Sequence, residues 1–191
     1  MCLKLRTIRD FLSFHECESL IFKYSGLELE KSKTTSPGSP KATSQTSSQN
    51  KKLDKSDLHR LKDKLSNKLD WSYQAIEDPH FIRYQVGDEY KPHYDDFPPI
   101  MFYMKSIAER NQLERHGNRI ATAILYLNEN FEGGETEFLL ANHRIKPETG
   151  LLSHWNNVNE EGMRIEKALH AGSEVIAGTK YIIGFHLREK Y

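Results

Sequence analysis

The part of the chain after Trp71 consists of short apolar or alternating runs separated by glycine and proline, and this pattern most constrains the fold. Many short runs at close spacing are typical of a β-sandwich or jelly roll rather than of alternating βαβ units. The predicted strands cover residues 81–86, 120–127, 137–140, 151–155, 169–171 and 181–187. We therefore predict a mainly β domain.

Two helices are expected ahead of these strands. Ser13 can cap a helix in which Glu16 closes a capping box, and this helix should end near Tyr24. A second helix is predicted over residues 56–68, where leucines recur at spacings of three and four residues. We expect both N-terminal helices to pack on one face of the β-structure.

Residues 32–50 differ in composition from the rest of the chain. Ten of these nineteen residues are Ser or Thr, two are proline, and Ala42 is the only apolar side chain. Such a segment cannot bury enough surface to offset the entropy lost on ordering. We predict a mobile insertion or lid within a single domain of residues 1–191, and residues 97–117 form a second candidate lid.

Charge and composition exclude several classes of protein. The 27 basic and 27 acidic side chains cancel, so no overall field attracts nucleic acid or an anionic membrane. No apolar run approaches the ~20 residues of a membrane-spanning helix, and two cysteines, Cys2 and Cys17, do not make a disulfide framework. We expect a soluble, cytoplasmic protein, with the lumen of the endoplasmic reticulum as the alternative if a leader or anchor has been removed.

A candidate metal site begins at His93 and Asp95. Residues two apart on a strand share a face, so both side chains can point at one ion. His170 is the candidate third ligand, and two histidines with one carboxylate form a facial triad that leaves three positions of Fe(II) open. The pair alone is weak support, because in a chain with nine histidines an ordinary surface or core histidine explains it equally well.

The residues around this pair belong to a longer series of motifs over residues 84–180. The series runs from Tyr84 to Asp95 (Y-x-x-G-x-x-Y-x-x-H-x-D), then Arg119 to Thr122, Tyr126-Leu127, Gly133 to Thr136, His170 to Gly172, and Lys180. It resembles the catalytic domain of the prolyl 4-hydroxylases, a branch of the Fe(II)- and 2-oxoglutarate-dependent oxygenases. The resemblance covers most of the chain outside the Ser/Thr-rich segment.

The resemblance implies a double-stranded β-helix (jelly-roll) core, with Fe(II), 2-oxoglutarate, O2 and, as reductant, ascorbate as cofactors. His93, Asp95 and His170 would hold the iron. Lys180 would pair with the distal carboxylate of 2-oxoglutarate, although composition alone favours a solvated lysine. Further co-substrate contacts are implied for Tyr84, Tyr126 and Thr136, and plain core packing is an equally good interpretation of Tyr126.

The implied reaction is 4-hydroxylation of peptidyl proline in a Pro-rich or collagen-like peptide, with release of succinate and CO2. Tyr90, Arg119 and His186 match positions that contact peptide in the family. Arg119 could equally pair with a nearby carboxylate. Many members have Trp at the position of His186 and Cys at that of Ser173, so the form of the peptide groove is open.

Two other functions compete with this one: a 2-oxoglutarate oxygenase acting on a nucleobase, another side chain or a small molecule, and a non-catalytic jelly-roll binding module. A nucleobase enzyme would favour a basic groove with interleaved aromatic residues, which the neutral chain does not show, so no nucleic-acid partner is expected. A non-catalytic module would lack a ligand or the anchoring lysine, and both are present. The sequence leaves the oligomeric state open.

Overall fold

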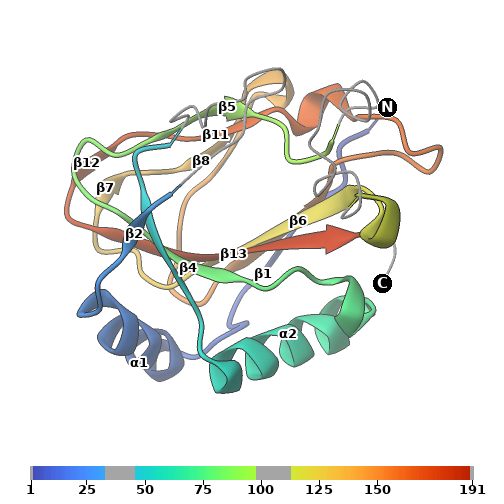
Figure 1. Cartoon of the computed structure of the whole chain (residues 1–191). Coiled ribbons are helices and arrows are strands. Elements are labelled where there is room, and N and C mark those ends of the chain that lie inside the picture. The colour runs from blue at the N-terminus through green and yellow to red at the C-terminus, as the bar shows by residue number, and fades with distance from the viewer. Residues whose placement is uncertain (1, 33–45, 98–112, 190–191) are drawn as a thin grey trace.

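The computed structural model describes residues 2–32, 46–97 and 113–189 (Figure 1). Within these ranges the strands form two facing sheets and a separate two-stranded sheet. The larger sheet has seven strands in the order β1 (Leu5–Ile8), β10 (Leu152–Asn156), β6 (Arg119–Tyr126), β13 (Lys180–Arg188), β4 (His80–Tyr84), β3 (Gln49–Lys52) and β2 (Glu30–Lys31). The smaller sheet has the order β5 (Tyr90–His93), β11 (His170–Gly172), β8 (Thr136–Phe138) and β9 (His143–Ile145).

The remaining strands, β12 (Val175–Ala177) and β7 (Glu132–Gly133), pair with each other. All of these pairings are antiparallel. The described residues also form three short 3-10 helices: η1 (Tyr73–Ala75) between α2 and β4, and η3 (Leu139–Ala141) and η4 (Glu166–Ala168) between strands. The arrangement is the double-stranded β-helix that we predicted.

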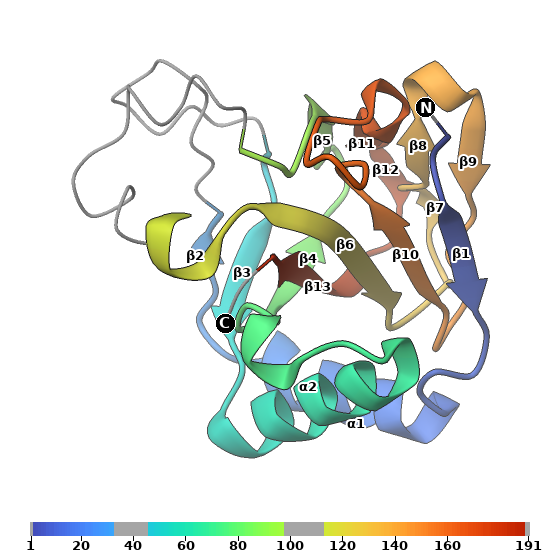
Figure 2. The ribbon, with the colours of Figure 1, turned by 90° about the vertical axis from the view of Figure 1, so that its right-hand side faces the viewer.

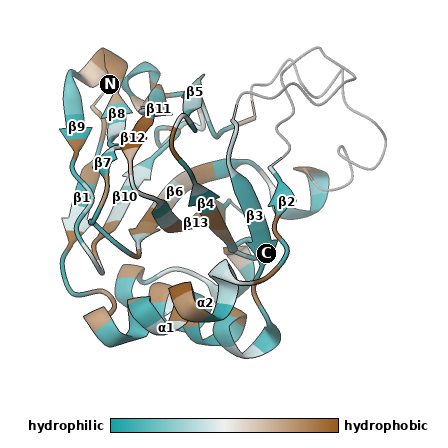
Figure 3. Ribbon diagram, turned by 90° about the vertical axis from the view of Figure 1, so that its left-hand side faces the viewer, coloured by the Kyte–Doolittle hydropathy of each residue, from teal (hydrophilic) through white to brown (hydrophobic). Residues whose placement is uncertain are grey.

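The larger sheet separates two apolar cores because side chains alternate along each strand. On β13, Ile183, Phe185 and Leu187 join the core that also contains residues of the helices. Ile182, which points to the opposite face, joins the core between the two sheets, together with Phe138 of the smaller sheet. Figure 3 shows the hydrophobic character of β13 at the centre of the molecule. The site described below lies on the side of the larger sheet that faces the smaller sheet.

Two helices cover the other side of the larger sheet (Figure 2). Helix α1 (Phe14–Ser25) begins with the predicted capping box, in which the side chains of Ser13 and Glu16 exchange hydrogen bonds with each other's backbone N–H. Helix α2 (Lys55–Leu69) begins at Asp54, whose side chain accepts a hydrogen bond from the Asp57 N–H. Both helix predictions are therefore confirmed.

The Ser/Thr-rich segment needs a correction at its C-terminal end. Gln49 and Asn50 lie in β3 and pair with β4, while Thr46 and Ser48 are buried. Sheet pairing satisfies this backbone, and the hydroxyl groups bond one another, with Thr46 Oγ1 donating to Ser48 Oγ at 2.9 Å. Polar composition therefore predicted mobility where a strand forms. Residues 33–45 of that segment, and residues 98–112 of the second candidate lid, lie outside the described residues.

Several strands were not predicted, because they are short or polar: β1, β2, β3, β7, β9 and β12. The run predicted as a strand over residues 137–140 ends earlier, at Phe138, where η3 begins. In the described residues, no helix is both long enough and apolar enough to cross a membrane.

Candidate metal centre

Strand pairing brings the two candidate histidine ligands together. His93 ends β5 and His170 begins β11, and the two residues are direct partners in the antiparallel ladder. Asp95 lies two residues beyond the end of β5, so it reaches the site from a bend and not, as we expected, from the same strand face as His93. Ligand atoms of His93, Asp95 and His170 all lie within 4.8 Å of one another.

The imidazole rings present Nε2 to the carboxylate. His93 Nε2 lies 3.5 Å from Asp95 Oδ1, and His170 Nε2 lies 3.5 Å from Asp95 Oδ2. On the other side of each ring, Nδ1 lies 2.8 Å from the Lys91 carbonyl oxygen in His93 and 2.9 Å from the Ala168 carbonyl oxygen in His170. A carbonyl can only accept, so both Nδ1 atoms carry the proton and both Nε2 lone pairs are left for a ligand bond.

Aromatic side chains fix both rings. Tyr90 stacks on His93 with ring centroids 3.7 Å apart, and Trp155 meets His170 edge-on at 4.9 Å. Burial lowers the pKa of His170 to about 4, which leaves its ring neutral near pH 7. Burial alone would raise the pKa of Asp95, but the neighbouring His170 and His186, together with His93, outweigh it and hold that pKa well below the usual range. His170 and Asp95 thus stand in the protonation states of metal ligands.

Lys180 is the first residue of β13 and lies opposite Tyr84 of β4. The residue is only 3% exposed, and its Nζ donates to the Gly134 carbonyl oxygen at 2.7 Å. No ion pair joins Lys180 to a carboxylate within the part of the chain that the structure describes. Burial accordingly lowers the pKa of this ammonium to about 8. A buried cation of this kind is a ready partner for a bound anion.

Three further candidate residues surround this lysine. The Nζ atom lies 5.0 Å from the ring centroid of Tyr84 and 5.8 Å from that of Tyr126. Tyr126 and Thr136 are buried and share a hydrogen bond of 2.7 Å between their hydroxyl oxygens. Burial raises the pKa of Tyr84 to about 12, although hydroxyl groups of Ser48 and Thr46 act in the other direction. These four candidates, Lys180, Tyr84, Tyr126 and Thr136, come from four strands, and we refer to them below as the candidate co-substrate residues, or co-substrate residues for short.

Two of the candidate peptide-contacting residues, Arg119 and His186, lie beside carboxylates. Arg119 donates from Nε and Nη2 to the two carboxylate oxygens of Glu77, at 2.7 and 2.8 Å. His186 lies between two carboxylates, with Nε2 3.6 Å from Asp95 Oδ1 and Nδ1 3.8 Å from Glu77 Oε2. Arg188 Nε also reaches Glu77, at 2.5 Å. We call Glu77, Arg119, His186 and Arg188 the Glu77 cluster.

The charge pairing in the Glu77 cluster is strong. Burial would raise the pKa of Glu77, but the hydrogen bond and charge of Arg119, with His186 and Arg188, lower it to about 2. The carboxylate pairing that we weighed as an alternative for Arg119 is therefore present in the structure. No signal in the sequence marked Glu77, which lies outside every motif, between η1 and β4.

Two other polar residues of the site were missed. Thr122 ends the Arg119 to Thr122 motif without a predicted role of its own, and its hydroxyl donates to Asp95 Oδ2 at 2.6 Å. Asn157 follows β10 and donates to Thr122. Alternation from Tyr126 along β6 places Thr122 on the site face, which was a usable signal, whereas nothing in the sequence marks Asn157.

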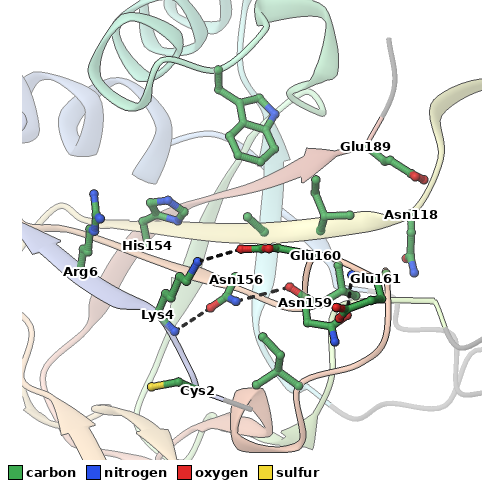
Figure 4. Close-up of a pocket in the computed structure, with 16 residues that line it drawn as sticks. Cys2, Lys4, Arg6, Asn118, His154, Asn156, Asn159, Glu160, Glu161 and Glu189 are labelled. Atoms are coloured by element: carbon green, nitrogen blue, oxygen red, sulfur yellow. Dashed lines mark hydrogen bonds and ion pairs between the residues drawn. The ribbon is translucent and has the colours of Figure 1, made fainter.

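A separate cavity of about 970 Å³ lies on the opposite face of the larger sheet (Figure 4). It is lined by residues such as Arg6, Ala121 and His154, and His154 alternates with Trp155, which contacts His170. Lys4 and Glu160 form an ion pair of 3.6 Å at its rim. The cavity includes none of the metal or co-substrate residues, so the side-chain geometry around Asp95 and Lys180 defines the functional site.

Comparison with known proteins agrees with this geometry. Residues 79–188 match the 2OG-Fe(II) oxygenase superfamily. This match covers more than half of the chain, and the chain therefore belongs to the 2OG-Fe(II) oxygenase superfamily.

Within that superfamily the chain resembles the prolyl 4-hydroxylases. It is 30% identical over 122 residues to prolyl 4-hydroxylase 1 of Arabidopsis thaliana, covering 57% of this chain and 40% of the relative. It is 33% identical over 119 residues to a putative prolyl 4-hydroxylase of Acanthamoeba polyphaga mimivirus, covering 62% and 47%. The chain thus matches less than half of the length of these relatives.

Solved structures match over almost the whole chain. The viral collagen prolyl hydroxylase of Paramecium Bursaria Chlorella virus-1, in its 2-oxoglutarate complex, superimposes with a TM-score of 0.69 at 26% identity, covering 96% of this chain and 95% of the other. A Pseudomonas putida prolyl-4-hydroxylase gives a TM-score of 0.63 at 17% identity, with 98% and 93% covered, which bears on the fold alone. The jelly-roll prediction is confirmed by these matches.

Proposed function

We propose that this chain is an Fe(II)- and 2-oxoglutarate-dependent dioxygenase that hydroxylates peptidyl proline in Pro-rich or collagen-like peptides. The observation that carries the proposal is the pairing of a His93, Asp95 and His170 ligand set with a buried lysine that has no carboxylate partner in the described residues. A metal ligand set alone fits many functions. The additional buried cation fits an acidic co-substrate.

The donor set suits Fe(II). Two neutral imidazoles and one carboxylate are the ligands of the facial triad, which leaves three positions for other ligands. The two backbone carbonyls that accept from Nδ1 supply the outer hydrogen bonds that orient such histidines. Iron, when bound with 2-oxoglutarate and O2, would supply the oxidation that converts 2-oxoglutarate into succinate and CO2 while one oxygen atom enters the substrate C–H bond.

The co-substrate residues suit 2-oxoglutarate. Lys180 would pair with its distal carboxylate, and such a charge-assisted hydrogen bond is strong where water is excluded. Tyr84 and the Tyr126–Thr136 hydroxyl pair would supply further hydrogen bonds beside that carboxylate. The anion would also relieve the cost of keeping the ammonium buried, which the lowered pKa of Lys180 expresses.

The peptide substrate is proposed from the relatives, whose names refer to prolyl and collagen hydroxylation. Tyr90 would present its ring beside His93 at the edge of the metal centre. Arg119 already uses two donor groups on Glu77, so a role for it in holding peptide would be shared with a structural role. His186 Nε2 lies 3.6 Å from Asp95 Oδ1, and this proximity supports a role for the polar ring in contacting a substrate near the metal.

The first competing function, oxidation of a nucleobase or another small substrate, shares the metal and co-substrate residues and differs only in substrate. The polar Glu77 cluster gives it some support, because a peptide-proline ring favours apolar contact. Membership of the oxygenase superfamily and the complete ligand set weigh against the non-catalytic module.

Incubation of the protein with Fe(II), 2-oxoglutarate, ascorbate and a panel of Pro-rich peptides tests the proposal. We expect a mass increase of one oxygen atom on proline and an equal amount of succinate, both absent in Asp95→Ala. Succinate formation that responds to a nucleobase or another small molecule, and not to any peptide, would transfer the assignment to the first competing function. If the intact, iron-loaded protein forms no succinate with any peptide or small molecule, the result would favour the binding module.

A further inference from the structure

A chain of hydrogen bonds reaches Asp95 from a residue outside the metal-binding motifs. We propose that Asn157 and Thr122 are positioning residues that orient the Asp95 carboxylate so that it binds metal through one oxygen. The inference rests on the proposed function, since it requires Asp95 to be a metal ligand. It adds to that function by naming the residues that keep a coordination position free for the co-substrate.

The chain has two links, both buried. Thr122 of β6 donates from Oγ1 to Asp95 Oδ2 at 2.6 Å. Asn157 donates from Nδ2 to Thr122 Oγ1 at 2.9 Å, and also to the Arg119 carbonyl oxygen at 3.3 Å. Thr122 is 3% exposed and Asn157 is 1% exposed, so water does not compete freely for either side chain.

The direction of the chain follows from the chemistry of its first residue. The Arg119 carbonyl can only accept a hydrogen bond, so the Asn157 atom that faces it must be the NH2 nitrogen. The same nitrogen faces Thr122, which therefore accepts from Asn157. A hydroxyl has one proton, and with Asn157 as its donor Thr122 directs that proton to Asp95. If the amide were reversed, Asn157 Oδ1 would face the Arg119 carbonyl oxygen, and neither atom could donate.

The backbone of Asn157 is held in place independently. Its N–H donates to the Ile120 carbonyl at 2.9 Å, and its own carbonyl accepts from the Ile165 N–H at 2.9 Å. Its side-chain Oδ1 is buried and has no hydrogen-bond partner in the described residues. The orientation that points Nδ2 at Thr122 thus leaves Oδ1 unsatisfied. A buried unsatisfied acceptor is unfavourable for stability, so stability alone does not explain this orientation.

The consequence for the metal concerns the two carboxylate oxygens. Oδ2 carries the short Thr122 hydrogen bond, which restricts rotation of the carboxylate and withdraws electron density from that oxygen. Binding through both oxygens would occupy one of the three open positions of the triad. By holding Oδ2, Thr122 favours metal binding through Oδ1 alone. The three open positions then stay free for the two chelating atoms of the co-substrate and for O2.

Titration of the whole protein chain with Co(II), without 2-oxoglutarate, tests the role of these hydrogen bonds. The Co(II) affinity and the visible absorption both report on the ligand set. Thr122→Val keeps the shape and removes the hydroxyl, and Thr122→Ser is the matched control that retains it. We expect Thr122→Val to raise the Co(II) Kd about 10-fold, as loss of an outer hydrogen bond to a metal ligand does, and to change the absorption intensity. Thr122→Ser should keep both wild-type values.

Asn157→Leu tests the upstream link. It should raise the Co(II) Kd in the wild-type background and have no further effect in Thr122→Val, because it acts through the hydroxyl. If Thr122→Val does not fold, Asn157→Leu alone must still raise the Kd and alter the spectrum. A merely structural role would lower the melting temperature of the metal-free protein and leave the Co(II) spectrum unchanged.

Wild-type Co(II) affinity and spectrum in folded Thr122→Val, or equal effects of Asn157→Leu in both backgrounds, would overturn the inference. Asp95→Ala separates this outcome from failure of the proposed function. If Asp95→Ala binds Co(II) as the wild type does, Asp95 is not a ligand and the proposed function fails. If Asp95→Ala loses binding while Thr122→Val is unaffected, only the positioning inference fails.

Discussion

The co-substrate residues and the Glu77 cluster take residues from opposite ends of β13 and are built differently. Lys180 is buried without a carboxylate partner in the described residues. Arg119 and Arg188, in contrast, already share the carboxylate of Glu77. The first region therefore holds a cation that a ligand can pair with, whereas both arginines of the second already have a carboxylate partner. From this difference we propose that the first region binds the anion and that the shape of the second governs substrate choice.

The largest expected effect comes from removing a metal ligand, because both regions depend on the same metal centre. His93→Ala, Asp95→Ala and His170→Ala should each reduce turnover on the order of 100-fold or more, because two remaining ligands bind Fe(II) poorly. Metal content of the purified variants, measured beside succinate formation, checks this expectation. Full turnover in any one variant would remove that residue from the ligand set.

Lys180→Ala should break the co-substrate region while leaving the metal centre nearly intact. Truncating one partner of a buried charge pair costs about 2–5 kcal/mol, which at ~1.4 kcal/mol per decade corresponds to a rise of roughly 30-fold or more in the 2-oxoglutarate requirement. Steady-state kinetics in 2-oxoglutarate, with Co(II) affinity as the control, measures the effect. Unchanged 2-oxoglutarate kinetics would require another cation, and Arg119 or Arg188 would be the next candidates.

The pH dependence of 2-oxoglutarate binding gives a graded test of the same contrast. Burial lowers the pKa of Lys180 to about 8 in the free protein, so the ammonium is charged below pH 8 and loses its proton above it. Affinity should be constant below pH 8 and weaken about 10-fold for each pH unit above it, until the raised pKa of the complex is reached. Calorimetric titrations at several pH values measure this slope. Lys180→Arg stays charged throughout and should bind with little change across the same range.

The smallest effect is expected in the Glu77 cluster. His186→Trp restores the large ring found in many prolyl 4-hydroxylases, and an added aromatic contact is worth ~0.5–1.5 kcal/mol. We expect the KM for a Pro-rich peptide to fall about 2- to 10-fold while the KM for 2-oxoglutarate stays unchanged. Comparison of the two KM values in one variant measures how far the regions act separately. A shift in the 2-oxoglutarate KM instead would mean that His186 acts through Asp95, from which it lies 3.6 Å.

The same contrast explains what the sequence could predict. His93, Asp95, His170 and Lys180 lie in short motifs, and alternation along β6 places Tyr126 and Thr122 on one face. The Glu77 cluster instead depends on contacts between residues far apart in the chain, because Glu77 precedes β4 while Arg119 opens β6 and His186 lies in β13. No local pattern encodes such contacts.

Fold prediction succeeded and failed for similar reasons. Apolar strands such as β13 and the capped helix α1 follow directly from periodicity and capping residues. Strand β3 has the sequence Gln-Asn-Lys-Lys, which carries no apolar signal, and it forms because β4 offers a free edge for pairing. Asp95 reached the site from a bend, so the strand argument that grouped it with His93 gave the right residues for an incomplete reason.

Anaerobic titration of the Fe(II)-loaded protein with 2-oxoglutarate tests the central claim most directly, since it needs no knowledge of the substrate. An α-keto acid chelated to Fe(II) in this site should produce a saturable visible charge-transfer absorption. We predict that this absorption appears in the wild type, is absent in Asp95→Ala, and requires roughly 30-fold or more 2-oxoglutarate in Lys180→Ala. A wild-type protein that binds Fe(II) but shows no 2-oxoglutarate-dependent absorption would contradict the assignment of this site to a 2-oxoglutarate oxygenase.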